Sequence, residues 1–322
     1  MLTAQCFPLC PLAERSFPVP DRIRGVWCAT LTPLGPAGAP DHARLAAHVA
    51  RLFAAGVDGI ALFGTTGEGQ SFSTSERRAG LDAMLENGIP AARIVAGTGC
   101  AALTETIELT RHALAAGCAG ALVLPPFFFK GVSDEGLYAS YARLIDGVAD
   151  ARLKLYLYHI PQVTEVPIAH EVIARLMARY PGVLAGVKDS GGDLQHTRRL
   201  LARFSDLAIF VGHEPHLPAA LAAGGAGTIC GIANLYPRLM RRFHDRSLGG
   251  DYKEDLHRIE TFIARLEGYP LFAAFKALLA DLTGDPAWEA LRPPLVALAT
   301  AQRNEWIAAV AQTGIVAERD AA

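Results

Sequence analysis

The chain has little net charge, because 30 lysines and arginines balance 32 aspartates and glutamates. It therefore lacks the basic excess that is typical of nucleic-acid binders, and we expect no nucleic-acid partner. It also lacks an apolar run of the roughly 18 residues that a membrane helix needs. Its longest apolar stretch, around 115–129, is interrupted by Pro125 and Pro126. We therefore expect no association with a membrane.

Cysteine is scarce and scattered, with six residues at positions 6, 10, 28, 100, 118 and 230. No Cys-x-x-Cys occurs, and no histidines stand at zinc-finger spacing from these cysteines, so we expect no metal site. Cysteines in this pattern are usually small buried residues, and a reducing, cytoplasmic compartment fits them best. Residues 1–21 contain four prolines and no basic region ahead of apolar residues. They indicate an N-terminal tail, with only weak resemblance to a signal peptide.

What the sequence does have is apolar character, at 51% hydrophobic and 19% charged residues. Such a chain can bury a large core. Short apolar runs alternate with glycine- or proline-containing loops and amphipathic stretches. Near-continuous apolar character indicates strands that are buried on both faces, as in a parallel sheet. The expected strands are 26–30, 59–63, 93–96, 119–124, 153–158, 183–187, 208–211 and 226–230.

Helix signals lie between these strands. Asp41 can cap a helix that ends before Gly56, and Ser73 with Glu76 forms a capping box for the next helix. Eight strand–helix units favour an α/β fold, a (β/α)8 TIM barrel over residues 22–235. An open doubly wound sheet is the alternative. After residue 235 the pattern is helical to about residue 315, so residues 236–322 are expected to form a C-terminal helical extension.

Lys188 is the most informative polar residue, because it directly follows the apolar run 183–187. In a barrel, side chains at the carboxyl ends of strands line the active site. Desolvation there disfavours the ammonium form, and a neutral amine can form a Schiff base with a ketone. The alternative is a structural lysine that pairs with Asp189 at the end of the strand.

Two more strand ends carry candidate groups. The phenol of Tyr158 could move protons to and from a substrate, or Tyr158 could be a core residue with a satisfied hydroxyl. The loop Gly-Thr-Thr-Gly at 64–67 could hold a carboxylate with its hydroxyls and amides. A phosphate cradle is the competing interpretation, although no Gly-Lys-Ser/Thr follows the loop.

Two further clusters favour structural interpretations. His-Glu-Pro-His at 213–216 includes potential metal ligands, but a polar loop is the simpler interpretation because no further cluster completes a site. The basic run 238–246 is short and is most simply a solvated helix face.

Four motifs in one order carry a family resemblance. They are Gly-Thr-Thr-Gly-Glu at 64–68, Glu-Gly-Leu-Tyr at 135–138, Tyr-His-Ile-Pro at 158–161 and Gly-Val-Lys-Asp-Ser-Gly-Gly-Asp at 186–193. Together they resemble the dihydrodipicolinate synthase / N-acetylneuraminate lyase family, over nearly the whole chain from about residue 24. The resemblance implies a (β/α)8 barrel with C-terminal helices, a homotetramer or homodimer, and class I aldolase or lyase chemistry without metal or organic cofactor.

The same resemblance implies roles for individual residues. Lys188 matches the Schiff-base lysine that attacks the keto carbon of pyruvate or another 2-oxo acid, and Tyr158 matches the tyrosine that relays the proton. The remaining matches are Thr65 and Thr66, which bind the pyruvoyl carboxylate, Ser190, which faces the second half of the substrate, and Ile229, which lines the pocket.

Departures from the family pattern bear on the substrate. Val163 stands where the synthase has an arginine that binds a carboxylate, and a valine cannot make that contact. Phe129 stands where the synthase places a tyrosine that reaches across a dimer interface, and a phenyl ring cannot relay a proton. Glu165 replaces a glycine found in most members and adds negative charge near the pocket mouth. The changes at Val163 and Phe129 together argue against 4-hydroxy-tetrahydrodipicolinate synthase activity.

Sialate lyase also fits poorly, because its acidic pair and its serine become Glu214, Pro215 and Gly231. The motifs Lys-Asp-Ser-Gly-Gly-Asp at 188–193 and Cys-Gly-Ile-Ala-Asn at 230–234 are most similar to those of 4-hydroxy-2-oxoglutarate aldolase and sugar-acid aldolases. The leading hypothesis is a carbon–carbon lyase that cleaves or forms a 2-oxo acid with pyruvate as the common half. The alternatives are the synthase, a sugar-acid dehydratase of the same family, and a barrel that binds oxo acids without turnover.

Overall fold

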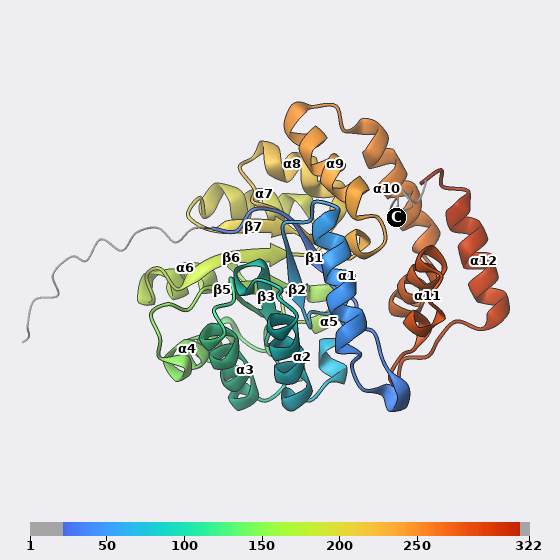
Figure 1. Ribbon diagram of the computed structural model, residues 1–322. Helices are drawn as coiled ribbons and strands as arrows, with labels where there is room; N and C mark the ends of the chain where they lie inside the picture. Colours follow the sequence, from blue (N-terminus) through green and yellow to red (C-terminus); the bar gives the residue numbers. More distant parts are fainter. Residues whose placement is uncertain (1–21, 316–322) are drawn as a thin grey trace, which may run out of the picture.

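The structure, a computed structural model, describes residues 22–315, so the tail predicted for residues 1–21 lies outside the described residues. Eight parallel strands form a closed barrel in sequence order, and β1 pairs with β8 to complete it (Figure 1). The predicted TIM barrel is thereby confirmed, and the open-sheet alternative is wrong. The strands are β1 (Gly25–Ala29), β2 (Gly59–Leu62), β3 (Ile94–Gly97), β4 (Gly120–Val123), β5 (Leu155–His159), β6 (Leu184–Asp189), β7 (Ala208–Val211) and β8 (Gly227–Cys230).

Every strand residue is buried, as the near-continuous apolar runs predicted. Alternate residues point into and out of the barrel, because successive side chains of a strand face opposite ways. The interior holds one cluster that includes Trp27, Tyr156, Tyr158, Phe210 and Ile229. Two further clusters lie between the strands and the surrounding helices. The barrel is therefore packed, and chemistry is confined to its ends.

The helices surround the strands (Figure 1). Both predicted N-terminal signals are confirmed: Asp41 accepts a hydrogen bond from the amide of Arg44, and Ser73 with Glu76 forms a complete capping box. The helices of the barrel are α1 (His42–Ala54), α2 (Thr74–Glu86), α3 (Leu103–Ala115), α4 (Asp134–Val148), α5 (Pro161–Thr164), α6 (His170–Arg179), α7 (Leu194–Arg203) and α8 (Leu217–Ala222). Short 3-10 turns occur at η1 (Pro36–Gly38), η2 (Gly69–Ser71), η3 (Ala91–Arg93), η4 (Glu214–His216) and η5 (Ile232–Asn234).

After the barrel, four helices continue the chain on the side of α1 (Figure 1). They are α9 (Pro237–Gly249), α10 (Lys253–Leu266), α11 (Leu271–Thr283) and α12 (Thr300–Ala311). Helices α1 and α9–α12 share one hydrophobic cluster, and Arg44 of α1 pairs with Asp285 just after α11. The stretch expected to be purely helical is interrupted between α11 and α12, where only the 3-10 turn η6 (Pro286–Glu289) forms. Prolines at 286, 293 and 294 explain the interruption, because proline cannot continue a helix interior.

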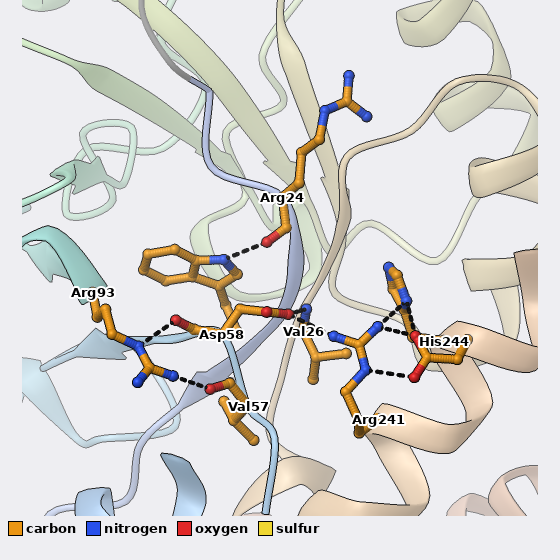
Figure 2. A network of polar contacts seen from close by, with 9 residues as sticks. Arg24, Val26, Val57, Asp58, Arg93, Arg241 and His244 are labelled. Atoms are coloured by element: carbon orange, nitrogen blue, oxygen red, sulfur yellow. Dashed lines mark hydrogen bonds and ion pairs between the residues drawn. The ribbon is translucent and has the colours of Figure 1, made fainter. Parts of the chain in front are cut away.

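Arg241, in the basic run of α9, binds the C-terminal extension to the end of the barrel where the strands begin (Figure 2). Arg241 pairs with Asp58 at 2.7 Å, and the same carboxylate accepts the amide of Val26 at 2.7 Å. Gly25 leaves room for this carboxylate, since a Cβ there would lie 2.0 Å from Asp58 Oδ2. Arg93 donates to the Asp58 carbonyl from the other side at 2.8 Å. The expectation of a simply solvated face is therefore wrong at Arg241, whose guanidinium joins α9 to β1 and β2.

Candidate active site

Tyr158 of β5 and Lys188 of β6 are direct neighbours in the strand pairing, so their side chains lie side by side on the same face of the sheet. Both lie at the carboxyl ends of their strands, and both are almost fully buried, at 3% and 4% exposure. The Lys188 Nζ stands over the Tyr158 ring, 4.1 Å from its centroid. Tyr158 belongs to the interior cluster of the barrel, so the lysine amine and the phenol share the inner face at the open end.

The surroundings of Tyr158 favour release of its proton. Burial by itself raises the pKa of this phenol, but the charge of Lys188 and the nearby polar groups of Thr65, Lys188 and Ser190 outweigh burial and lower the pKa below its usual value. These three neighbours come from the ends of two different strands, β2 and β6. The phenol is therefore the point at which three of the predicted site residues meet.

Asp189 faces the opposite side of β6, because it follows Lys188 in the strand. Its Oδ2 accepts hydrogen bonds from His196 Nδ1 at 3.0 Å and from the Thr197 hydroxyl at 2.8 Å. Its Oδ1 accepts the Gly191 amide at 3.1 Å. Burial raises the pKa of Asp189, but these hydrogen bonds prevail and lower it. The alternative in which Asp189 neutralises Lys188 is therefore wrong.

A histidine cluster behind the strand ends was missed by the sequence reasoning. His159, Asp189 and His196 have potential ligand atoms within 4.8 Å of one another. His159 stacks on His196 at 4.3 Å, beside a pocket of about 390 Å³. However, His159 Nδ1 accepts the amide of Ile168 at 3.1 Å, and His196 Nδ1 donates to Asp189. Because Nδ1 of His159 accepts a hydrogen bond, Nε2 of the neutral ring carries the proton and offers no lone pair to a metal ion. The alternation of side chains along a strand could have predicted this cluster. His159 and Asp189 each follow an inward-facing residue, so both point outward on neighbouring strands.

The loop after β2 brings Thr65 and Thr66 to the same end of the barrel. Two residues that are not glycine, Phe63 and Glu68, take left-handed backbone conformations with φ of 55° on either side of the threonines. Gly67 is also required, because a Cβ there would lie 2.5 Å from the carbonyl oxygen of Thr30. Such conformations cost of order 1–3 kcal/mol each and persist only where surrounding contacts hold them. The loop is therefore a tight, strained turn.

Ser190 and Ile229 complete the set of predicted site residues. A Cβ at Gly212, after β7, would lie 1.9 Å from Ser190 Oγ and 3.2 Å from Lys188 Cε. Gly212 thus leaves the space that these two side chains occupy, a requirement that the sequence analysis did not recognise. Gln162 donates to the Ser190 carbonyl at 2.6 Å. Ile229 is fully buried in the interior cluster with Tyr158.

The residues that depart from the family pattern lie farther out. Phe129 is 66% exposed and packs edge-on against Phe128. Val163 is also exposed, and Glu165 pairs with Lys130 at 3.6 Å on the surface.

The loop 213–216 is not simply a polar surface loop, because the carboxyl group of Glu214 points into the protein. Glu214 is buried and accepts the Ile232 amide at 3.5 Å, and burial raises its pKa. The rings of His213 and His216 lie 4.5 Å apart. Within residues 22–315, none of these three side chains belongs to a group with metal-ligand geometry.

Comparisons with known proteins identify the family of the chain. The chain matches the Dihydrodipicolinate synthetase family over residues 22–313. It is 38% identical over 290 residues to an uncharacterized DapA-like lyase of Chloroflexus aurantiacus, covering 89% of this chain and 94% of the relative. It is 32% identical over 304 residues to the 4-hydroxy-tetrahydrodipicolinate synthase of Phenylobacterium zucineum, covering 91% and 98%.

A solved structure gives the same picture. The dihydrodipicolinate synthase of Agrobacterium tumefaciens superposes with a TM-score of 0.85 at 35% identity, covering 90% of this chain and 99% of that one. The barrel fold and these matches together define a class I aldolase or lyase, as the motifs predicted. The chain belongs to the dihydrodipicolinate synthetase family.

In the described part of the chain, the helices are too short or too polar to cross a lipid bilayer.

Proposed function

We propose that this protein is a Schiff-base-forming carbon–carbon lyase that acts on 2-oxo acids, with pyruvate as the common half. The observation that carries the proposal is the contact between Lys188 Nζ and the Tyr158 ring, 4.1 Å from its centroid, inside the closed barrel. A small 2-oxo acid is the partner that these groups suit.

In the proposed reaction, the ammonium group of Lys188 passes a proton to the Tyr158 phenolate, and the resulting neutral amine attacks the keto carbon of the substrate. The Tyr158 phenol transfers protons so that the hydroxyl of the carbinolamine leaves as water and an iminium forms. The iminium accepts the electron pair of the bond between C3 and C4 of a 4-hydroxy-2-oxo acid. The 4-hydroxyl gives its proton to the deprotonated Tyr158 phenol, and the carbon that carries it becomes an aldehyde. Protonation of the resulting enamine at C3, followed by hydrolysis, releases pyruvate and restores the amine.

The other predicted residues have binding roles in this proposal. Thr65 and Thr66 hold the carboxylate next to the keto carbon, and Ile229 lines the apolar side of the pocket. Ser190, whose polar side chain helps to lower the pKa of Tyr158, faces the departing half of the substrate. Exposed Val163 offers no charge for a second carboxylate, which favours a substrate other than that of the synthase.

The assembly and compartment belong to the proposal as well. We expect a homotetramer or a homodimer, and the exposed pair Phe128 and Phe129 is the apolar surface that supports this. The described cysteines are free thiols, which supports a cytoplasmic location.

Borohydride trapping tests the proposal directly. Incubation with pyruvate and borohydride should add one reduced pyruvoyl group to Lys188, detected by peptide mass spectrometry. Lys188→Ala should remain unlabelled, whereas Lys253→Ala, which changes a lysine on α10, should label normally. A wild-type protein that stays unmodified would contradict the proposal.

A panel of 2-oxo acids then distinguishes the alternatives. Release of pyruvate together with an aldehyde supports the lyase. Loss of water without pyruvate indicates the sugar-acid dehydratase. Imine formation with no product from any member indicates an oxo-acid-binding barrel, an alternative motivated by the phenyl ring of Phe129.

A further inference from the structure

A buried ion pair joins the C-terminal extension to the loop that carries Thr65 and Thr66. Lys276, in the middle of α11, places its Nζ 2.5 Å from Glu68 Oε1. Both side chains are 0% exposed. Glu68 is two residues beyond Thr66, and the proposed mechanism gives neither Glu68 nor Lys276 a role.

The segment after α11 closes on the same loop. Lys276 Nζ also donates to the Ala290 carbonyl at 2.9 Å. Two residues later, Arg292 donates to the Ser71 carbonyl at 2.7 Å and pairs with Glu76 at 2.7 Å. Lys276 therefore connects three pieces of chain: α11, the segment 290–292, and the loop that begins after β2.

The loop needs such contacts because its backbone is strained at Glu68, which has a φ of 55°. Glu68 also follows Gly67, whose missing Cβ allows close approach to the Thr30 carbonyl. The residue before Lys276 contributes packing: a Cβ on Gly231 would lie 2.9 Å from the Phe275 ring and 3.5 Å from Thr66 Cγ2. Phe275 and Thr66 thus border the same glycine at the end of β8.

Placing two charges in the interior is costly, and a buried ion pair often stabilises no more than an apolar pair of the same volume. Burial raises the pKa of Glu68 and lowers that of Lys276, and each group counteracts the shift of the other. Removing one partner leaves the other charge buried without compensation. The ion pair therefore links a lysine of α11 to a loop residue that has a left-handed backbone conformation.

We propose that Lys276 is a positioning residue: by holding Glu68, it keeps Thr65 and Thr66 in the geometry that binds the carboxylate of the substrate. The C-terminal extension is then a structural part of the active site. This inference rests on the proposed Schiff-base function.

The test compares two ketones that differ only at the carboxylate. Pyruvate and acetone can both form an imine with Lys188, but only pyruvate can use Thr65 and Thr66. The second-order rate constant for borohydride trapping is measured with each ketone in wild type, Lys276→Met and Glu68→Gln. We expect trapping by pyruvate to fall at least tenfold in both variants, and trapping by acetone to stay within twofold.

The matched control is Asp255→Asn. Asp255 of α10 is also a fully buried partner of arginines in the extension, but those arginines, Arg242 and Arg246, lie on α9, so the contact does not involve the threonine loop. Removing the charge of Asp255 should lower the melting temperature without changing the ratio of the rate constants for pyruvate and acetone. A double variant, Glu68→Gln with Lys276→Met, removes both charges together. It is therefore expected to fold even if a single variant does not, and should show the same selective loss.

The outcomes separate this inference from the function on which it rests. The positioning role is overturned if a variant traps pyruvate as fast as wild type does. It is also overturned if the rate constants for pyruvate and acetone fall by the same factor. If wild type traps neither ketone, the Schiff-base proposal itself fails. A selective loss in Asp255→Asn would show that any damage to the extension has this effect, and would also overturn the inference.

Discussion

Acidification should destabilise this protein through His48, a buried histidine of α1. Its Nε2 donates to Asn234 Oδ1 at 3.0 Å, and its Nδ1 accepts from Arg51 at 3.3 Å. Asn234 in turn donates to the Ala29 carbonyl at the end of β1 at 2.8 Å. Burial first, and then the charge of Arg51, lowers the pKa of His48 to about 3, against the smaller opposing effect of the Asn234 hydrogen bond.

The size of the effect follows from proton linkage. In the unfolded chain a histidine has a pKa of about 6.5. Between pH 6.5 and pH 3 the unfolded state therefore binds a proton that the folded state refuses, and folding stability falls as the pH falls. Each pKa unit corresponds to about 1.4 kcal/mol. Lowering the pH from 7 to 5 should cost about 2 kcal/mol at this residue, and the full shift is worth about 5 kcal/mol below pH 3.

Urea unfolding at pH 7, 6 and 5 measures this contribution when wild type is compared with His48→Gln. Glutamine keeps an N–H donor for Asn234 but does not titrate in this range. At pH 7 the variant should be less stable than wild type, because it loses the ring packing of His48 against Trp288. That deficit should shrink by about 2 kcal/mol at pH 5. A deficit that stays constant across the three pH values would refute the reasoning.

Two further predictions concern catalysis. Tyr158→Phe should lower pyruvate release from a cleavable 2-oxo acid by about 10²–10⁴-fold while the protein stays folded, since it removes the phenol that transfers protons; circular dichroism checks the fold, and unchanged turnover would exclude the relay. Gly212→Ala should slow trapping of pyruvate on Lys188, because the new Cβ would lie 1.9 Å from Ser190 Oγ and 3.2 Å from Lys188 Cε. Adding Ser190→Gly removes the closer contact and should partly restore trapping, whereas no recovery would place the damage elsewhere.

The strands could be predicted from sequence because each is a short apolar run that is buried on both faces. The predicted 183–187 and observed Leu184–Asp189 differ by one residue at the start and two at the end. The end matters most, because Lys188 and Asp189 are polar and an apolar pattern stops before them. Backbone pairing with β5 and β7 extends the strand through both residues, and that pairing is invisible in the local sequence.

Site residues that resemble a family motif could be named from sequence, whereas residues that support them could not. Glu68 belongs to the recognised motif, yet its partner Lys276 lies more than 200 residues away on α11. The space at Gly212 is likewise defined by the side chains of Lys188 and Ser190 on the neighbouring strand. Such contacts depend on chain segments that meet only after the barrel closes.

The sequence by itself determined the repeating strand–helix order, the apolar interior, the helix caps and the identity of the polar groups at the strand ends, because these follow from local periodicity and residue chemistry. Tertiary structure alone decided that the lysine amine lies over the phenol, that Asp189 turns away to His196, and that α11 reaches the threonine loop. The physical reason is that barrel closure and helix packing set the distance between atoms remote in sequence, and both hydrogen bonding and desolvation depend on that distance.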